Sequence, residues 1–190
     1  MSGTPLTAGS RPAPGAFPRR RINFAGFLIC VGLIAYALYA QFHLGLDPCP
    51  LCIFQRIGIA ALGVIFLIAA LHNPHRWGAR VYAVLLAILA LVTVGVAARQ
   101  LYLQHLPPGA IPACGAPLSM MLKWMPITAV IRKVLTGSGE CGIVNWTFLG
   151  LAMPAWVLIC AALLGGAGVI ANFRGAGAPR PVRPEGFSAR

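Results

Sequence analysis

The sequence predicts an all-α membrane protein, a bundle of four transmembrane helices with a short interfacial helix in the second outer loop. Hydrophobic residues make up 58% of the 190-residue chain and charged residues only 9%, whereas soluble domains carry about 25% charged residues. The net charge of +12 could indicate nucleic-acid binding. However, the Lys and Arg residues fall in short clusters between uncharged stretches, which is typical of a chain that crosses a membrane repeatedly.

Four stretches are apolar enough and long enough to cross about 30 Å of hydrocarbon. They run over about 22–41, 52–71, 81–98 and 146–171. The first could be a signal peptide, since a run of arginines precedes it, but its uncharged core of roughly 20 residues exceeds the 7–15 of a signal peptide. We therefore expect a retained span. Pro154 lies inside the fourth stretch and is expected to kink it.

The distribution of basic residues predicts the orientation. Both tails and the 72–80 loop contain arginines, the 42–50 loop contains no Lys or Arg, and the 99–145 loop has four in nearly fifty residues. By the positive-inside rule, the tails and the 72–80 loop face the cytoplasm and the other two loops face outward.

The two ends of the chain differ in composition from the part between them. Residues 1–21 and 173–190 are rich in Pro, Gly, Ala and Arg and lack any apolar period. Such segments cannot bury enough apolar surface to fold. We expect two disordered cytoplasmic tails around one membrane domain over 22–172.

The cysteines divide into two kinds. Cys30 and Cys160 lie in the middle of apolar spans, where a cysteine behaves as a small hydrophobic residue. The other four lie two in each outer loop, at Cys49, Cys52, Cys114 and Cys141. The exterior is a compartment in which disulfides form and persist, so these four are the candidate redox residues.

The first pair stands at the start of the second span. Prolines at 48 and 50 suit the beginning of a helix, where free backbone N–H groups stabilise a thiolate at Cys52. Arg56 follows four residues later, on the same helical face one turn deeper. An arginine inside a membrane is costly, so it either snorkels to the interface or is functional. Beside Cys52 it could hold a thiolate, or a polar ligand whose body lies in lipid.

The second pair, Cys114 and Cys141, lies in two Gly/Pro-rich segments. The apolar stretch between them, PLSMMLKWMPITAVIRKVL, carries three basic residues and predicts the interfacial helix, with Trp124 near the lipid headgroups. The pair is either a plain loop-closing disulfide or, because its ends lack regular structure, one that is open to attack by another thiol.

Two other classes of protein fit four outward-facing cysteines. One is a tetrahedral zinc site, although the interval between the two pairs is far longer than in compact zinc motifs. The other is a scaffold or transporter with structural disulfides, in which the Cys-x-x-Cys pair would be inert towards an electron acceptor.

The chain resembles the DsbB family, the bacterial inner-membrane proteins that generate disulfide bonds. The resemblance covers about 22–172, and its most specific parts are PCPLCIFQR at 48–56, the LKWMP…GSGEC run at 122–141 and FLGLAMPAW at 148–156. It implies an enzyme that reoxidises a periplasmic DsbA-like thioredoxin-fold partner and passes the electrons to a membrane quinone. The DsbA–DsbB–quinone route is general knowledge of the family and does not follow from these residues alone.

The resemblance also implies a role for each outer cysteine. Cys114 and Cys141 match the pair that meets the soluble partner, with Cys114 as the sulfur that the partner attacks. Cys49 and Cys52 match the pair that delivers electrons to quinone, with Cys52 next to the quinone ring. We expect oxidation to pass between the pairs through contact of Cys141 with Cys49.

The remaining site residues implied by the resemblance contact the quinone, either ubiquinone or menaquinone. Arg56 matches the quinone-contacting arginine. His105, in RQLYLQHLP, resembles the family's histidine near the quinone, with a looser local match. Taken alone, His105 would more often be an ordinary loop residue. The expected partners are thus the DsbA-like protein, quinone and the lipid bilayer, with no metal and no nucleic acid.

Overall fold

The structure, a computed structural model, describes residues 19–46, 48–74, 76–107, 118–136, 139–142 and 146–175. In chain order its elements are α1 (Arg19–His43), α2 (Pro50–His72), α3 (Arg76–Gln104), α4 (Leu118–Trp124), α5 (Ile127–Thr136), α6 (Gly139–Gly142), β1 (Thr147–Phe148), β2 (Leu151–Ala152) and α7 (Met153–Gly175). Within the described residues, four helices, α1, α2, α3 and α7, are long and apolar enough to cross a membrane. The prediction of an all-α, four-span membrane protein is confirmed.

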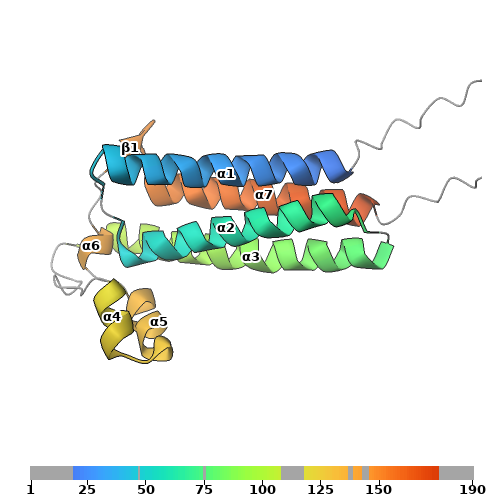
Figure 1. The fold of residues 1–190 in the computed structure, drawn as a ribbon. Helices are drawn as coiled ribbons and strands as arrows, with labels where there is room; N and C mark the ends of the chain where they lie inside the picture. Colours follow the sequence, from blue (N-terminus) through green and yellow to red (C-terminus); the bar gives the residue numbers. More distant parts are fainter. Residues whose placement is uncertain are drawn as a thin grey trace, which may run out of the picture.

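The four long helices form one bundle (Figure 1). Extensive contacts join α1 to α2, α2 to α3 and α3 to α7, while the contact between α1 and α7 is smaller. We call the end of the bundle where α1 ends and α2 begins the cysteine end, because Cys49 lies there. Helices α4, α5 and α6 lie at the cysteine end, whereas α1 begins and α7 ends at the opposite end (Figure 1).

Helix α3 is longer than the predicted span over 81–98 and continues to Gln104. The residues added at this end, RQLYLQ at 99–104, contain neither Gly nor Pro, so nothing breaks the helix before Pro107. The added turns carry polar side chains towards Cys49 and Cys52, and this decides the composition of the site.

Helix α7 begins later than the predicted span over 146–171. Strands β1 and β2 precede it as an antiparallel hairpin. Leu149 (φ 52°) and Gly150 (φ 78°) form its two-residue turn, and positive φ at both positions matches the twist of paired strands. Pro154 consequently occupies the first turn of α7, where proline is tolerated. Pro154 therefore does not lie in the interior of a helix, and the prediction that it kinks the fourth span is wrong.

The predicted interfacial segment is helical but consists of two short helices, α4 and α5, which are separated around Pro126. A proline lacks the N–H that a continuous helix needs, and it disfavours helical geometry at the residue before it. Met121, Val130 and Val134 pack in one buried cluster with Leu51 of α2 and Leu103 of α3. Trp124 stays exposed, at 82% of its surface. The α4–α5 pair is therefore held against the bundle by its apolar side.

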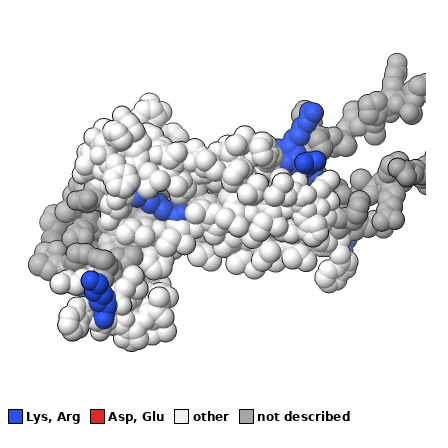
Figure 2. Space-filling model, viewed as in Figure 1, with Lys and Arg blue, Asp and Glu red and all other residues white. Residues whose placement is uncertain are grey.

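Lys and Arg side chains occupy separate parts of the surface. On the face drawn in Figure 2, basic side chains gather near the start of α1 and over α4 and α5, and the surface between them is mostly uncharged. A further basic side chain lies in a hollow of that uncharged surface (Figure 2). Long apolar helices with charges near the ends are suited to a bilayer. The predicted tails over 1–21 and 173–190 lie mostly outside the described residues, except that 19–21 belong to α1 and 173–175 to α7.

Glycines let the helices pack closely around Phe66, whose side chain lies in the core. A Cβ on Gly168 of α7 would lie 2.8 Å from both the Phe66 ring and the Leu86 side chain, whereas a Cβ on Gly166 would meet nothing within 4 Å. Small residues at such contacts allow helices to approach each other in membranes.

Replacing Gly168 with alanine should therefore lower the stability of the protein, by about 1–3 kcal/mol for a methyl forced into a packed core. Gly166→Ala is the matched control on the same helix and should be neutral. The measurement is thermal unfolding of both variants in the same detergent. An equal loss in the two variants would mean that helix flexibility, and not close packing, is the cause.

Candidate functional site

Cys49 and Cys52 lie at the N-terminus of α2, as predicted. Cys49 is the N-cap residue with extended backbone angles (φ −63°, ψ 161°), and Pro50 is the first helical residue. Cys52 follows within the first turn, where backbone N–H groups have no partner inside the helix. The Cys49 thiol donates a hydrogen bond to Cys52 Sγ, with the two sulfurs 3.2 Å apart.

Cys141 lies on the other side of Cys49. Helix α6 carries Cys141 into the buried cluster formed by α4, α5 and the ends of α2 and α3, so that 1% of its surface is exposed. A hydrogen bond with Cys141, a second one with Cys52, and burial together raise the pKa of the Cys49 thiol far above its usual range. Cys49 thus contacts one cysteine from each predicted pair. Cys114 lies outside the described residues.

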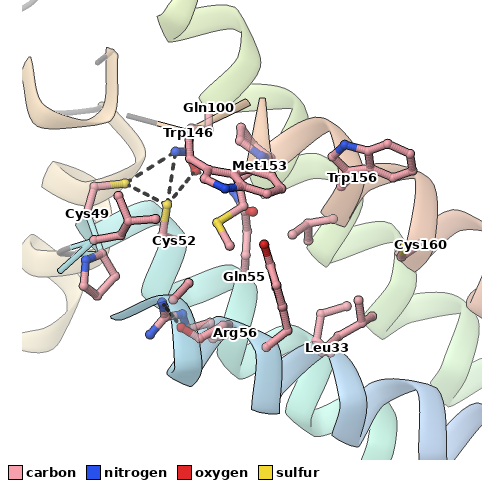
Figure 3. A pocket seen from close by; sticks show the side chains of 18 of the residues that line it. Leu33, Cys49, Cys52, Gln55, Arg56, Gln100, Trp146, Met153, Trp156 and Cys160 are labelled. Atoms are coloured by element: carbon pink, nitrogen blue, oxygen red, sulfur yellow. Dashed lines mark hydrogen bonds between the residues drawn. The ribbon is translucent and has the colours of Figure 1, made fainter. Parts of the chain in front are cut away.

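A buried pair of glutamines holds the sulfurs of Cys49 and Cys52. The Gln100 side-chain amide nitrogen donates to Cys52 Sγ at 3.2 Å and to Cys49 Sγ at 3.5 Å. Its carbonyl oxygen accepts a hydrogen bond from Gln55 Nε2 at 2.7 Å and a longer one from the Cys52 thiol at 3.6 Å. Both glutamine side chains are only 3% exposed. Figure 3 shows Gln100 facing both sulfurs, with Gln55 one turn along α2.

Next to these sulfurs lies a cavity of about 620 Å³. It lies at the cysteine end of the bundle and is lined by residues of α1, α2, α3 and α7. Tyr36 of α1 and Trp146 line this cavity and pack edge to face with their ring centroids 6.1 Å apart. Trp156 of α7 also lines it and donates its indole N–H to the backbone carbonyl of Phe148 in the β1–β2 hairpin, at 3.1 Å. The cavity is therefore aromatic and apolar, with sulfur and amide groups at one side (Figure 3).

Arg56 lines the same cavity. Its guanidinium donates to Gln41 Oε1 and, at 3.1 Å, to the Ala37 carbonyl of α1. The charge also acts on Cys52, and a nearby positive charge favours a thiolate. Arg56 is thus half-buried and tied to α1, which differs from an arginine that merely snorkels to the interface.

The structure does not bring His105 to the cavity lining. His105 follows the end of α3, its side chain is exposed, and its ring Nδ1 hydrogen-bonds the Leu101 carbonyl at 2.7 Å. The contact is local, between residues one turn apart. A role for His105 near quinone remains a prediction that the geometry does not support.

The two mid-span cysteines differ from each other. Cys30 is buried in the core, as expected for a packing residue, and its Cβ lies 3.0 Å from the position that a Cβ on Gly63 would take. Cys160 is half-buried and lines the cavity. In the described part of the chain, no three His, Cys, Asp or Glu side chains are grouped so as to hold a metal ion.

Sequence reasoning missed the glutamines and Trp156. Gln55 stands beside Arg56 inside an apolar span, where a neutral polar side chain also needs a partner, and that signal could have identified it. Gln100 falls just beyond the predicted third span, in what the sequence predicts to be a loop. Only the extension of α3 to Gln104 places Gln100 against the cysteines.

Comparisons with known proteins agree with this geometry. The family model described as "Disulfide bond formation protein DsbB" matches residues 19–171. A "Disulfide bond formation protein B" from Xanthomonas oryzae pv. oryzae (strain MAFF 311018) is 55% identical over 135 residues, which cover 70% of this chain and 78% of the relative. Proteins of the same name from Nitrosococcus oceani and Methylococcus capsulatus are 46% identical over 146 residues (77% and 86% of the two chains) and 50% identical over 135 residues (71% and 82%). The chain therefore belongs to the DsbB family of disulfide bond formation proteins.

Proposed function

We propose that this protein reoxidises a periplasmic DsbA-like thioredoxin-fold protein and passes the electrons to a membrane quinone, generating disulfide bonds de novo. One observation carries the proposal. Cys49 contacts Cys141 on one side and Cys52 on the other, and Cys52 lines an apolar cavity inside a membrane helix bundle. A chain of sulfurs thus leads from the loops to a cavity at the edge of the membrane-spanning part.

The cavity fits a quinone ring. Its volume of about 620 Å³ is within the roughly 300–1,000 Å³ usual for small-molecule sites. Trp146 and Trp156 provide flat apolar walls, and Arg56 provides N–H donors suited to a carbonyl oxygen. When bound there, the quinone supplies a two-electron acceptor. Arg56 would hold it, and the apolar walls would exclude water.

The proposed route consists of four thiol–disulfide exchanges and one oxidation. The reduced partner attacks Cys114 of the Cys114–Cys141 disulfide and releases the Cys141 thiolate. Cys141 then attacks Cys49 of the Cys49–Cys52 disulfide, so that a Cys49–Cys141 bond forms and the Cys52 thiolate leaves. The partner's second thiol displaces Cys114 from the mixed disulfide, and the freed Cys114 attacks Cys141, which restores the Cys114–Cys141 disulfide and releases Cys49 as a thiolate. The Cys49–Cys52 disulfide forms again as these two thiolates lose two electrons to the acceptor in the cavity. The exchanges conserve the number of disulfides, and only the last step adds one.

The proposed location is the bacterial inner membrane, with both termini cytoplasmic and the cysteine end periplasmic. The distribution of Lys and Arg supports this orientation. The periplasm is also the compartment that keeps disulfides oxidised. DsbA-type disulfides are strongly oxidising, with a reduction potential of about −120 mV. Their regeneration therefore requires an electron acceptor of still higher reduction potential, and a quinone is such an acceptor.

The direct test supplies reduced DsbA-like protein to the purified protein under anaerobic conditions, first stripped of quinone and then with a soluble quinone added. Oxidation of the partner, followed by thiol alkylation on gels, should stop after a stoichiometric burst without quinone and become catalytic with it. Partner mixed with quinone alone is the control. Catalytic turnover of the quinone-free protein would contradict the proposal.

A further inference from the structure

We propose that Gln100 is a catalytic residue, whose side-chain amide stabilises the Cys52 thiolate and is oriented for this by Gln55. This inference rests on the proposed function, because it concerns the step in which the Cys52 sulfur leaves Cys49. None of the family motifs noted above, PCPLCIFQR, LKWMP…GSGEC or FLGLAMPAW, includes Gln100.

The shortest contacts of Gln100 orient its amide. Gln55 Nε2 donates to the Gln100 carbonyl oxygen at 2.7 Å, so the oxygen is directed towards Gln55. The amide nitrogen faces the sulfurs, 3.2 Å from Cys52 and 3.5 Å from Cys49. The carbonyl oxygen also accepts a longer hydrogen bond from the neutral Cys52 thiol, at 3.6 Å, which a thiolate cannot donate, whereas the amide N–H can still donate to the thiolate. Both glutamines are almost completely buried, so water cannot readily replace either bond.

A buried hydrogen-bond donor has its largest effect on the charged form of its acceptor. A bond to a charged group is stronger than one to a neutral group, and a low local dielectric strengthens it further. A neutral amide provides this without adding a second fixed charge beside Arg56. Gln100 also contacts Cys49, so the same amide is within reach of both sulfurs as the Cys49–Cys52 bond breaks and forms again.

The step itself is balanced within the protein. The Cys141 thiolate attacks Cys49 Sγ, the Cys49–Cys141 bond forms as the Cys49–Cys52 bond breaks, and the electron pair of the broken bond stays on Cys52 Sγ. Gln100 donates its N–H to that sulfur and transfers no proton. Loss of this donor makes Cys52 a poorer leaving group and leaves less of it as thiolate.

The test measures the reactivity of Cys52 without quinone or partner. In the full-length chain, all other cysteines are replaced by serine or alanine, and the rate of Cys52 alkylation by iodoacetamide is followed from pH 6 to pH 10. Among the residues that the structure describes, the charged and titratable groups that act on Cys52 are Cys49, Cys141 and Arg56. In this background Arg56 alone remains, and it is the same in every variant compared.

Gln100→Met keeps the length of the side chain and removes the donor. We expect the alkylation rate at pH 7 to fall about tenfold or more, as for loss of a hydrogen bond to a charged group, and the deficit to shrink towards pH 10 as the thiol ionises in both proteins. Gln100→Asn withdraws the amide by one methylene and should show the same deficit. If Gln100→Met does not fold, Gln100→Asn is the variant that tests the proposal.

The matched control breaks a buried amide pair elsewhere. Asn172 donates to Asn23 Oδ1 at 3.0 Å, far from the cysteine end, and Asn172→Leu should leave the alkylation profile of Cys52 unchanged. If the alkylation rate falls less than threefold at pH 7, Gln100 does not have the proposed role. A fall that persists at pH 10 would also overturn the proposal, because it would mean that the substitution changes the access of iodoacetamide to Cys52 and not its ionisation. Neither result bears on quinone reduction by the wild-type protein, which separately tests the proposed function.

Discussion

Replacing Cys52 with serine is expected to abolish quinone reduction while leaving the protein able to form a trapped mixed disulfide with its partner through Cys114. Cys49 and Cys52 both line the cavity, but Cys49 also contacts Cys141, so Cys52 is the last sulfur of the chain. A serine hydroxyl cannot form the Cys49–Cys52 disulfide and is a poor nucleophile near neutral pH. The electron path would therefore end at Cys49, and turnover should fall to the background rate.

Two measurements check this prediction. Quinone reduction is followed by absorbance with reduced partner as the electron source, and the partner complex is detected on non-reducing gels. Cys30→Ser is the matched control, since Cys30 lies in the packed core and takes no part in the proposed path. Quinone reduction by Cys52→Ser at the wild-type rate would show that the electrons leave through another residue.

Arg56→Met should raise the KM for quinone about tenfold or more, the effect of losing a hydrogen bond from a charged donor, while exchange with the soluble partner changes little. Methionine preserves the apolar bulk of the side chain and removes the charge and all five N–H donors. Some loss of kcat is also expected, because the charge of Arg56 acts on Cys52. In the proposed mechanism, exchange with the partner takes place at Cys114, which is remote in sequence from Arg56.

The contacts of Arg56 require one further control. Arg56 also holds α1 through Gln41 and the Ala37 carbonyl, so Arg56→Met could act by loosening α1. Gln41→Leu removes that side-chain contact and keeps the charge, and it should raise the KM for quinone much less. The measurements are steady-state quinone reduction at several quinone concentrations and stopped-flow exchange with reduced partner. If the two variants raise the KM equally, Arg56 acts by holding α1. If partner exchange is impaired and the KM for quinone is unchanged, Arg56 acts in partner exchange and not in quinone reduction.

The sequence was sufficient for the parts of the fold that depend on local composition. Four long apolar stretches, in which Arg56 is the one charged residue, predicted four spans, because a helix that crosses the hydrocarbon core must be apolar over its length. The prolines at 48 and 50 predicted the start of α2, since proline favours the first turn of a helix and disfavours its interior. These local rules also identified Cys49, Cys52 and Arg56 as neighbours at that helix end.

The same rules were less accurate where a helix could end at several places. The apolar period stops near residue 98, but α3 continues to Gln104, because residues without Gly or Pro remain helical when neighbouring elements pack on them. At two other positions a proline makes a helix shorter than predicted. Pro126 separates α4 from α5, and Pro154 marks the first turn of α7.

The membrane environment, the number of spans and the candidate redox cysteines could all be predicted from the sequence, because they depend on composition and on spacing along one helix. Other features follow only from the packing of the helices: Cys141 contacts Cys49, Gln100 faces both sulfurs of the first pair, and the cavity lies among α1, α2, α3 and α7. Those contacts join residues about 50 to 110 positions apart in the chain. They depend on how helices pack against one another, and side-chain packing between distant segments leaves no periodic signal in the sequence.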